Sequence, residues 1–104
     1  MGPGNGKPVS YRVIISAKIA QDIREAKKKA VKAGLGQQFV AGLAILLQRL
    51  RDNPKAVGEP YWHYAHLKLV VHVAASGPVA IDFGIHEEQP LVFIRRVLLL
   101  SEDE

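Results

Sequence analysis

The hydrophobic pattern is strongest in residues 91–101 (LVFIRRVLLLS), where two arginines interrupt a run of apolar, β-prone side chains. Strict alternation places Arg95 on one face of the predicted strand and Arg96 on the other, each with apolar neighbours. Apolar residues on both faces indicate a strand in the middle of a sheet, covered on both sides. A charged pair in such a strand is costly to bury without partners. We therefore expect either a sheet that leaves one end of this strand open or an anionic ligand that meets an arginine.

Alternation with period two also predicts strands earlier in the chain. These strands are residues 11–16 (YRVIIS), 67–74 (LKLVVHVA) and 79–85 (VAIDFGI). Residues 61–64 are compatible with a short strand or an irregular lead-in to the next one. Residues 76–78 (SGP) predict a tight turn, and residues 86–90 (HEEQP) predict a second hairpin loop. The C-terminal half is thus expected to form an antiparallel meander of three or four strands.

Helical periodicity occupies the region between the first strand and the meander. A helix is predicted over residues 17–33 with Ser16 as its N-cap, and a second helix over residues 37–51. Gly34 is expected to end the first helix in the left-handed conformation. Because the link is so short, the two helices must run antiparallel. The sequence predicts an α+β fold of order β-α-α-β-β-β, with an αα hairpin packed on one face of an antiparallel sheet.

Length and composition set the class of protein. The 104 residues suit a single domain, which we assign to residues 9–101, between a flexible start (1–8) and an acidic tail (102–104). The absence of cysteine excludes disulfides, thiolate catalysis and cysteine-ligated metals. No apolar run reaches the roughly 20 residues that span a membrane, and the first residues lack the apolar core of a signal peptide. We expect a cytoplasmic protein with no membrane partner, no metal site and no cofactor.

Positive charge is concentrated in the first 60 residues, which hold eleven Lys and Arg against four Asp and Glu. The last 44 residues hold three basic against six acidic side chains. This distribution suits an acidic partner, either nucleic acid or an acidic peptide. The helical residues proposed to contact nucleic acid are Lys27, Lys28, Lys32 and Arg51. The alternative interpretation of these residues is a solvated helix surface.

The candidate catalytic residues lie in the sheet half of the chain, where histidine can act as a general acid or base near neutral pH. Lys68 and His72 share one face of a predicted strand, roughly 13 Å apart. Arg96 would join them if its strand is the neighbour, and the three would then form a phosphate-binding or catalytic surface. The alternative is that Lys68 and His72 merely face solvent.

Two further groups have both a structural and a functional interpretation. One of the two arginines can pair with Asp82 on the adjacent strand as a structural salt link. Tyr61, Trp62 and Tyr64 could stack nucleic-acid bases, or they could belong to the core or to a partner interface.

Three stretches together resemble the RelE/ParE superfamily of bacterial toxin proteins. They are a strand entering a helix at residues 11–20 (YRVIISAKIA), a helix end and loop at 47–60 (LQRLRDNPKAVGEP), and two strands around an acidic turn at 79–97 (VAIDFGIHEEQPLVFIRRV). The resemblance covers about residues 9–100. It implies an αα hairpin on an antiparallel sheet and a partner antitoxin, peptide or protein, whose disordered tail wraps the toxin. It also implies RNA cleavage at the ribosome or inhibition of gyrase.

The chain departs from the cleaving members of this superfamily at two places. Those members commonly carry an arginine shortly before an aromatic residue in the penultimate strand, whereas here Ala80 precedes Phe83. Their last strand often ends in basic and tyrosine residues, whereas residues 98–101 (LLLS) and an acidic end stand here, which would repel RNA phosphates. Two interpretations stay open: a type II toxin that inhibits growth through mRNA cleavage or gyrase, and a catalytically inactive toxin-like module that binds protein or nucleic acid. A homodimer is also left open.

Overall fold

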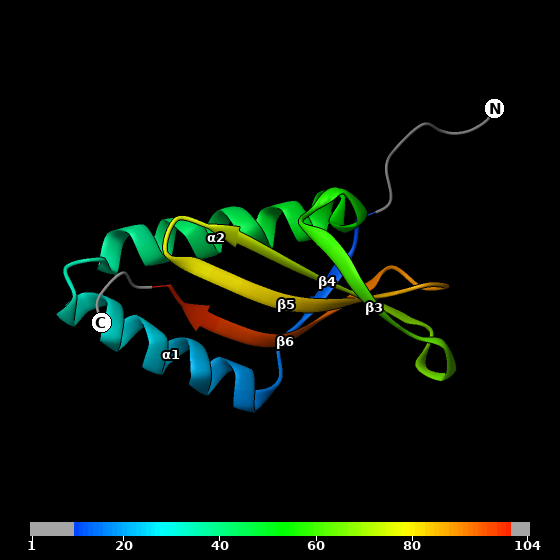
Figure 1. Ribbon diagram of the computed structural model, residues 1–104, viewed down its shortest axis with the longest axis horizontal. Helices are drawn as coiled ribbons and strands as arrows, with labels where there is room; N and C mark the ends of the chain where they lie inside the picture. Colours follow the sequence, from blue (N-terminus) through cyan, green and yellow to red (C-terminus); the bar gives the residue numbers. More distant parts are fainter. Residues whose placement is uncertain (1–9, 101–104) are drawn as a thin grey trace.

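A five-stranded sheet with two helices on one face forms the protein, as shown by a computed structural model (Figure 1). The structure describes residues 10–100, so the predicted flexible start (1–8) and acidic tail (102–104) lie outside the described residues. The elements in chain order are β2 (Arg12–Ile14), α1 (Ala17–Lys32), α2 (Gly36–Asp52), the 3-10 turn η1 (Pro54–Ala56), β3 (Glu59–Tyr64), the 3-10 turn η2 (Ala65–Leu67), β4 (Leu69–Ser76), β5 (Val79–His86) and β6 (Leu91–Leu99). The predicted α+β class is confirmed.

The sheet has the strand order β2-β6-β5-β4-β3 and is mixed. Strands β3 to β6 form an antiparallel meander, of which β3 is the fourth strand that the sequence left open. β2 instead pairs in parallel with β6, with Arg12 opposite Leu91. The prediction of a wholly antiparallel sheet is therefore wrong for β2. Alternation tells which side chains share a face, but it does not tell the direction of a strand whose neighbour in the sheet is at the other end of the chain.

The local signals of the helical hairpin act as the sequence predicts. The Ser16 hydroxyl accepts a hydrogen bond from the Ile19 amide at 3.2 Å and so caps α1. Gly34 has φ +77° and follows α1 in the left-handed conformation. The two helices run antiparallel, with α1 packed mainly on β6 and α2 mainly on β4 (Figure 1). None of the described helices combines the length and apolarity needed to cross a membrane.

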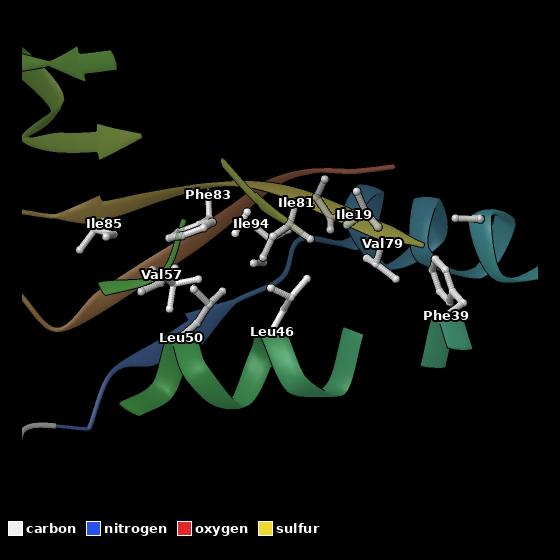
Figure 2. Close-up of a cluster of buried hydrophobic side chains, with 14 of the residues drawn as sticks. Ile19, Phe39, Leu46, Leu50, Val57, Val79, Ile81, Phe83, Ile85 and Ile94 are labelled. Carbon is white, nitrogen blue, oxygen red and sulfur yellow. The ribbon is translucent and has the colours of Figure 1, made fainter. Parts of the chain in front are cut away.

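The core lies between the helical hairpin and one face of the sheet (Figure 2). Its largest contributions come from side chains of both helices and of the two central strands: Ile19, Phe39, Leu46, Leu50, Val79, Ile81, Phe83, Ile85 and Ile94. Four of these residues alternate along β5, so the helices cover the β5 face that carries Phe83. The opposite face, which carries Asp82, is called the open face below, because neither helix covers it.

Candidate functional site on the open face

A β-bulge in β6 decides which side chains reach the open face. Arg96 is opposite Asp82 and Ile94 is opposite Phe83, so Arg95 is an extra residue without a partner on β5. Ile94 before the bulge and Val97 after it are both buried against the helices. The extra residue resets the alternation, and Arg95 and Arg96 both lie exposed on the open face. The prediction that they face opposite sides is wrong, because strict alternation holds only in a strand without a bulge.

The carboxylate of Asp82 binds two open-face side chains. Its Oδ1 accepts a hydrogen bond from Nη1 of Arg95 at 3.2 Å, so the predicted pairing of Asp82 with one arginine is confirmed for Arg95. Its Oδ2 accepts a hydrogen bond from the Tyr61 hydroxyl. The Arg95 guanidinium also lies 5.3 Å from the ring centre of Tyr64, which is cation–π distance. Trp62 meets Tyr64 edge to face, with ring centres 6.2 Å apart. Arg95 is thereby fixed in place by a carboxylate on one side and an aromatic ring on the other.

Arg96 differs from Arg95 because no hydrogen bond or ion pair joins its side chain to another residue between 10 and 100. It borders a hollow of about 280 Å³. The other residues that line this hollow are Tyr61, Val73, Ala80, Ile81, Asp82 and Leu98. Ala80, which precedes Asp82 on the same face of β5, is therefore one wall of the hollow. A guanidinium beside an open hollow, with no partner in the described part of the chain, is suited to binding an anionic group.

The contacts around Asp82 shift the acid–base behaviour of two neighbours. The hydrogen bond from Tyr61 to Asp82 raises the pKa of the Tyr61 phenol above its usual 10.0, and burial and the negative charge of Asp82 add to the effect. Partial burial works against the charged form of Arg95, but Asp82 and Tyr64 outweigh it and raise the arginine pKa. Arg95 therefore stays a cation, and Tyr61 stays a neutral hydrogen-bond donor through the physiological pH range.

Removing the Asp82 charge should make Tyr61 ionise earlier. In Asp82→Asn we expect one tyrosine to titrate at lower pH than in the parent, as measured by the ultraviolet absorbance of tyrosinate. Because the folded-state pKa of Tyr61 is raised, the stabilisation from this contact is complete below the unfolded value of about 10 and is lost as pH rises through the folded value. The parent should accordingly lose stability above pH 10 more steeply than Asp82→Asn. Identical tyrosine titrations for the two proteins would contradict the contact.

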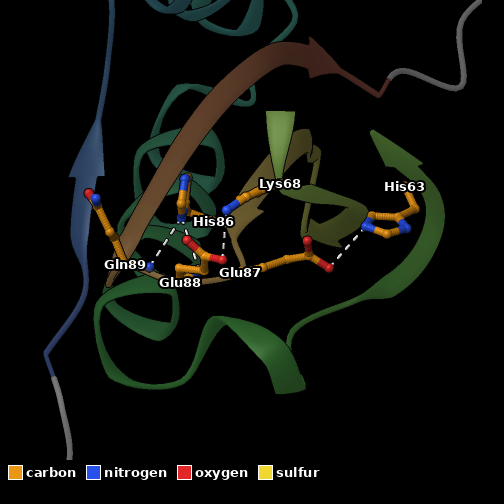
Figure 3. A network of polar contacts seen from close by, with 6 residues as sticks. All are labelled: His63, Lys68, His86, Glu87, Glu88 and Gln89. Carbon is orange, nitrogen blue, oxygen red and sulfur yellow. Dashed lines mark hydrogen bonds and ion pairs between the residues drawn. The ribbon is translucent and has the colours of Figure 1, made fainter. Parts of the chain in front are cut away.

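The predicted catalytic residues Lys68, His72 and Arg96 are not brought together. His72 faces the helix side of the sheet, is 5% exposed and lies with Nδ1 3.0 Å from the Val57 carbonyl oxygen. Lys68 precedes β4 in a left-handed conformation (φ 55°), and its Nζ pairs with Glu88 at 2.8 Å (Figure 3). Arg96 is on the open face, across the sheet from His72. The alternative interpretation is that Lys68 and His72 merely face solvent. It is correct for Lys68 and wrong for His72, which is buried.

Two of the remaining histidines, His63 and His86, make local contacts (Figure 3). Nε2 of His63 lies 2.9 Å from a carboxylate oxygen of Glu87, and Nδ1 of His86 accepts hydrogen bonds from the backbone amides of Glu88 and Gln89 in the β5–β6 loop. His66 is exposed in η2. Within residues 10–100, no three His, Asp or Glu side chains converge as metal ligands.

The four basic residues proposed to contact nucleic acid lie on the helices, away from the open face. Lys27, Lys28 and Lys32 are exposed in the second half of α1, whereas Arg51 is exposed in the last turn of α2. Because the helices are antiparallel, Arg51 is at the opposite end of the hairpin from Lys32 (Figure 1). A helix of 16 residues is roughly 24 Å long, so the four residues do not form one compact patch.

Sequence reasoning assigned the aromatic residues to base stacking, the core or a partner interface, but it did not connect them with the arginines. The structure brings Tyr61 and Tyr64 onto the same face as Arg95, with Tyr61 50% and Trp62 58% exposed. The interpretation of Tyr61 and Trp62 as core residues is excluded by these values. The open face thus offers stacking surfaces, a carboxylate, the fixed guanidinium of Arg95, and the guanidinium of Arg96, which no residue between 10 and 100 binds. Comparison with known proteins finds no matching family model and no match among curated proteins or solved structures.

Proposed function

We propose that this chain is a RelE/ParE-like toxin of a type II toxin–antitoxin system, and that the open face engages its target. The observation that supports this most is the bulge that brings Arg95 and Arg96 to one face, beside exposed aromatic rings. Aromatic side chains gathered in one exposed patch are typical of a surface that meets a partner. The helical hairpin on the other face leaves this surface free for a large target.

RNA is the target whose chemistry fits this surface best. Unstacked bases bind proteins by stacking on exposed aromatic rings, which Tyr61 and Trp62 provide. A phosphate between two bases requires a cation within reach, and Arg96 is the open-face arginine that has no hydrogen-bond or ion-pair partner among residues 10–100. We therefore favour RNA of the translation machinery over gyrase as the target. An acidic antitoxin segment that covers the same arginines is the proposed inhibitory partner.

RNA cleavage is a second candidate activity, and one observation favours it. The Asp82 carboxylate lines the hollow beside Arg96, where it could accept the 2′-hydroxyl proton while Arg96 holds the phosphate. Neither histidine nor lysine lines this hollow, and the acid–base groups at the end of the last strand of cleaving members are replaced here by leucines. The geometry therefore supports binding more directly than cleavage, and we propose target binding as the primary action.

Induced expression of the full chain in bacteria tests the proposal. We expect growth to stop within a few generations and to resume when the protein encoded beside this chain is co-expressed, because the antitoxin would cover the open face. Mapping of mRNA ends in the arrested cells separates the two modes of action: new ends indicate cleavage, and unchanged ends with stalled translation indicate binding. Normal growth at high expression of the folded chain would contradict the proposal.

A further inference from the structure

A second pocket, of about 470 Å³, lies on the helix side of the sheet, beyond the end of α2. Its walls come from η1, β3, β4, β5 and the β5–β6 loop: Lys55, Pro60, Val70, His72, Ile85, His86 and Glu87. Val70 and Ile85 are cross-strand partners on the helix-facing side, which here extends past the helices. The pocket is therefore on the opposite side of the sheet from Arg96 and is independent of the proposed target surface.

His72 contributes a nearly buried polar atom to this pocket. A carbonyl oxygen can only accept, so the contact of 3.0 Å between Val57 O and Nδ1 shows that Nδ1 carries a hydrogen. The ring also packs on Phe83, with ring centres 5.5 Å apart, so its orientation is fixed. The other ring nitrogen, Nε2, remains available to the pocket, because no residue between 10 and 100 forms a hydrogen bond with it. A buried polar atom of this kind is costly without a partner, so a water or a ligand must satisfy it.

The other polar groups of the pocket have fixed hydrogen-bond roles. Nδ1 of His86 accepts from two backbone amides, so the hydrogen of this imidazole is on Nε2, which is a donor. Lys55 is exposed on η1 and adds an ammonium group. The carboxylate of Glu87 extends toward His63 on β3, 2.9 Å from its Nε2, and away from His86 (Figure 3). The polar lining of the pocket therefore includes the Lys55 ammonium, the buried His72 imidazole and the Glu87 carboxylate, which is paired with His63.

We propose that this pocket binds a small organic oxyanion, a carboxylate or a phosphate ester, that carries an aromatic body. Its oxygens bind the Lys55 ammonium and Nε2 of His72, which takes up one proton from solvent and becomes a donor. The Val57 carbonyl already holds the Nδ1 hydrogen, so it stabilises the resulting imidazolium. The aromatic body packs on Val70, Ile85 and Pro60, and a pocket of this volume can accommodate a single-ring compound.

Nuclear magnetic resonance of the full chain with phenyl phosphate tests the site. We expect saturable shifts of the His72 imidazole nitrogens and the Val70 methyl groups, with Nε2 moving to a protonated value. Lys55→Met should weaken binding about tenfold, because one charge-assisted contact is lost, and it should leave the fold unchanged because Lys55 is exposed. Lys32→Met removes the same charge from the other end of the molecule and should leave the affinity unchanged.

Two further probes sharpen the outcome. Benzoate compared with phenyl phosphate identifies the preferred headgroup, and tight binding of either supports the site. Benzyl alcohol, which has the same ring and no charge, should bind at least tenfold more weakly than the better anion. The proposal is overturned if benzyl alcohol binds as well as the anions, if Lys55→Met and Lys32→Met have equal effects, or if no probe saturates the His72 shifts at millimolar concentration.

Discussion

Arg96→Glu is expected to abolish growth arrest and to weaken RNA binding by about a hundredfold, since truncating or reversing a close charge contact typically costs about 2–5 kcal/mol. Arg96 is the cation of the hollow that no described residue neutralises, so a phosphate can reach it. A glutamate in its place would stand opposite Asp82 and would put two carboxylates where the phosphate should bind. The measurement is the affinity for a short single-stranded RNA at fixed salt, beside the growth curve of induced cells.

Arg49→Glu is the matched control for this charge reversal. Arg49 is an exposed arginine in the last turn of α2, on the helix layer rather than on the open face. The Arg49→Glu substitution changes the net charge of the molecule by the same amount as Arg96→Glu. It therefore measures how much RNA affinity is lost through the overall charge alone. If Arg49→Glu weakened RNA binding as much as Arg96→Glu, the affinity would be a property of the overall charge and not of the open face.

The parts of the fold that the sequence predicts are those with local causes. Ser16 begins a helix because its hydroxyl meets a free backbone amide three residues later, and Gly34 ends the first helical region because it tolerates a positive φ. β4 and β5 alternate without interruption and are joined by a two-residue turn, so the residues of each strand that are predicted to share a face do share it. These features depend on a few neighbouring residues, which is why a pattern can reveal them.

The candidate site depends on features that no local pattern determines. The face of the sheet on which His72 lies depends on which side of β4 meets the helices. The parallel pairing of β2 depends on the direction in which β6, far along the chain, runs beside it. The bulge did leave a signal in the sequence. Val92 and Ile94 continue with period two, but the next apolar residue of the same buried face is Val97, one position out of phase. An odd spacing of apolar residues across a pair of charges is typical of a bulge, and it predicts that both charges share a face.

Deletion of Arg95 should therefore preserve the fold while it removes the bulge. Without this residue, Ile94, Arg96 and Val97 would follow one another opposite Phe83, Asp82 and Ile81, which is an uninterrupted antiparallel register. The chief loss is a partly exposed ion pair, so the free energy of unfolding should fall by about 1 kcal/mol. Urea unfolding with circular dichroism measures this change. A deletion in a central strand that is so well tolerated would be unusual, because a shift of one residue normally exchanges the two faces of a strand.

Deletion of Gly84 in β5 is the control, and it should abolish folding. To close the gap, the strand must move either Asp82 into the buried place of Phe83 or His86 into that of Ile85. Loss of a large core side chain costs about 2–5 kcal/mol, and a buried polar group without partners adds to it, which together approach the whole stability of a small domain. The Arg95 deletion has a second consequence, because Asp82 loses its ion-pair partner and lies directly opposite Arg96. We expect these two side chains to pair, so the folded deletion variant should no longer arrest growth. A variant that folds and still arrests growth would show that a guanidinium free of Asp82 is not what the target recognises.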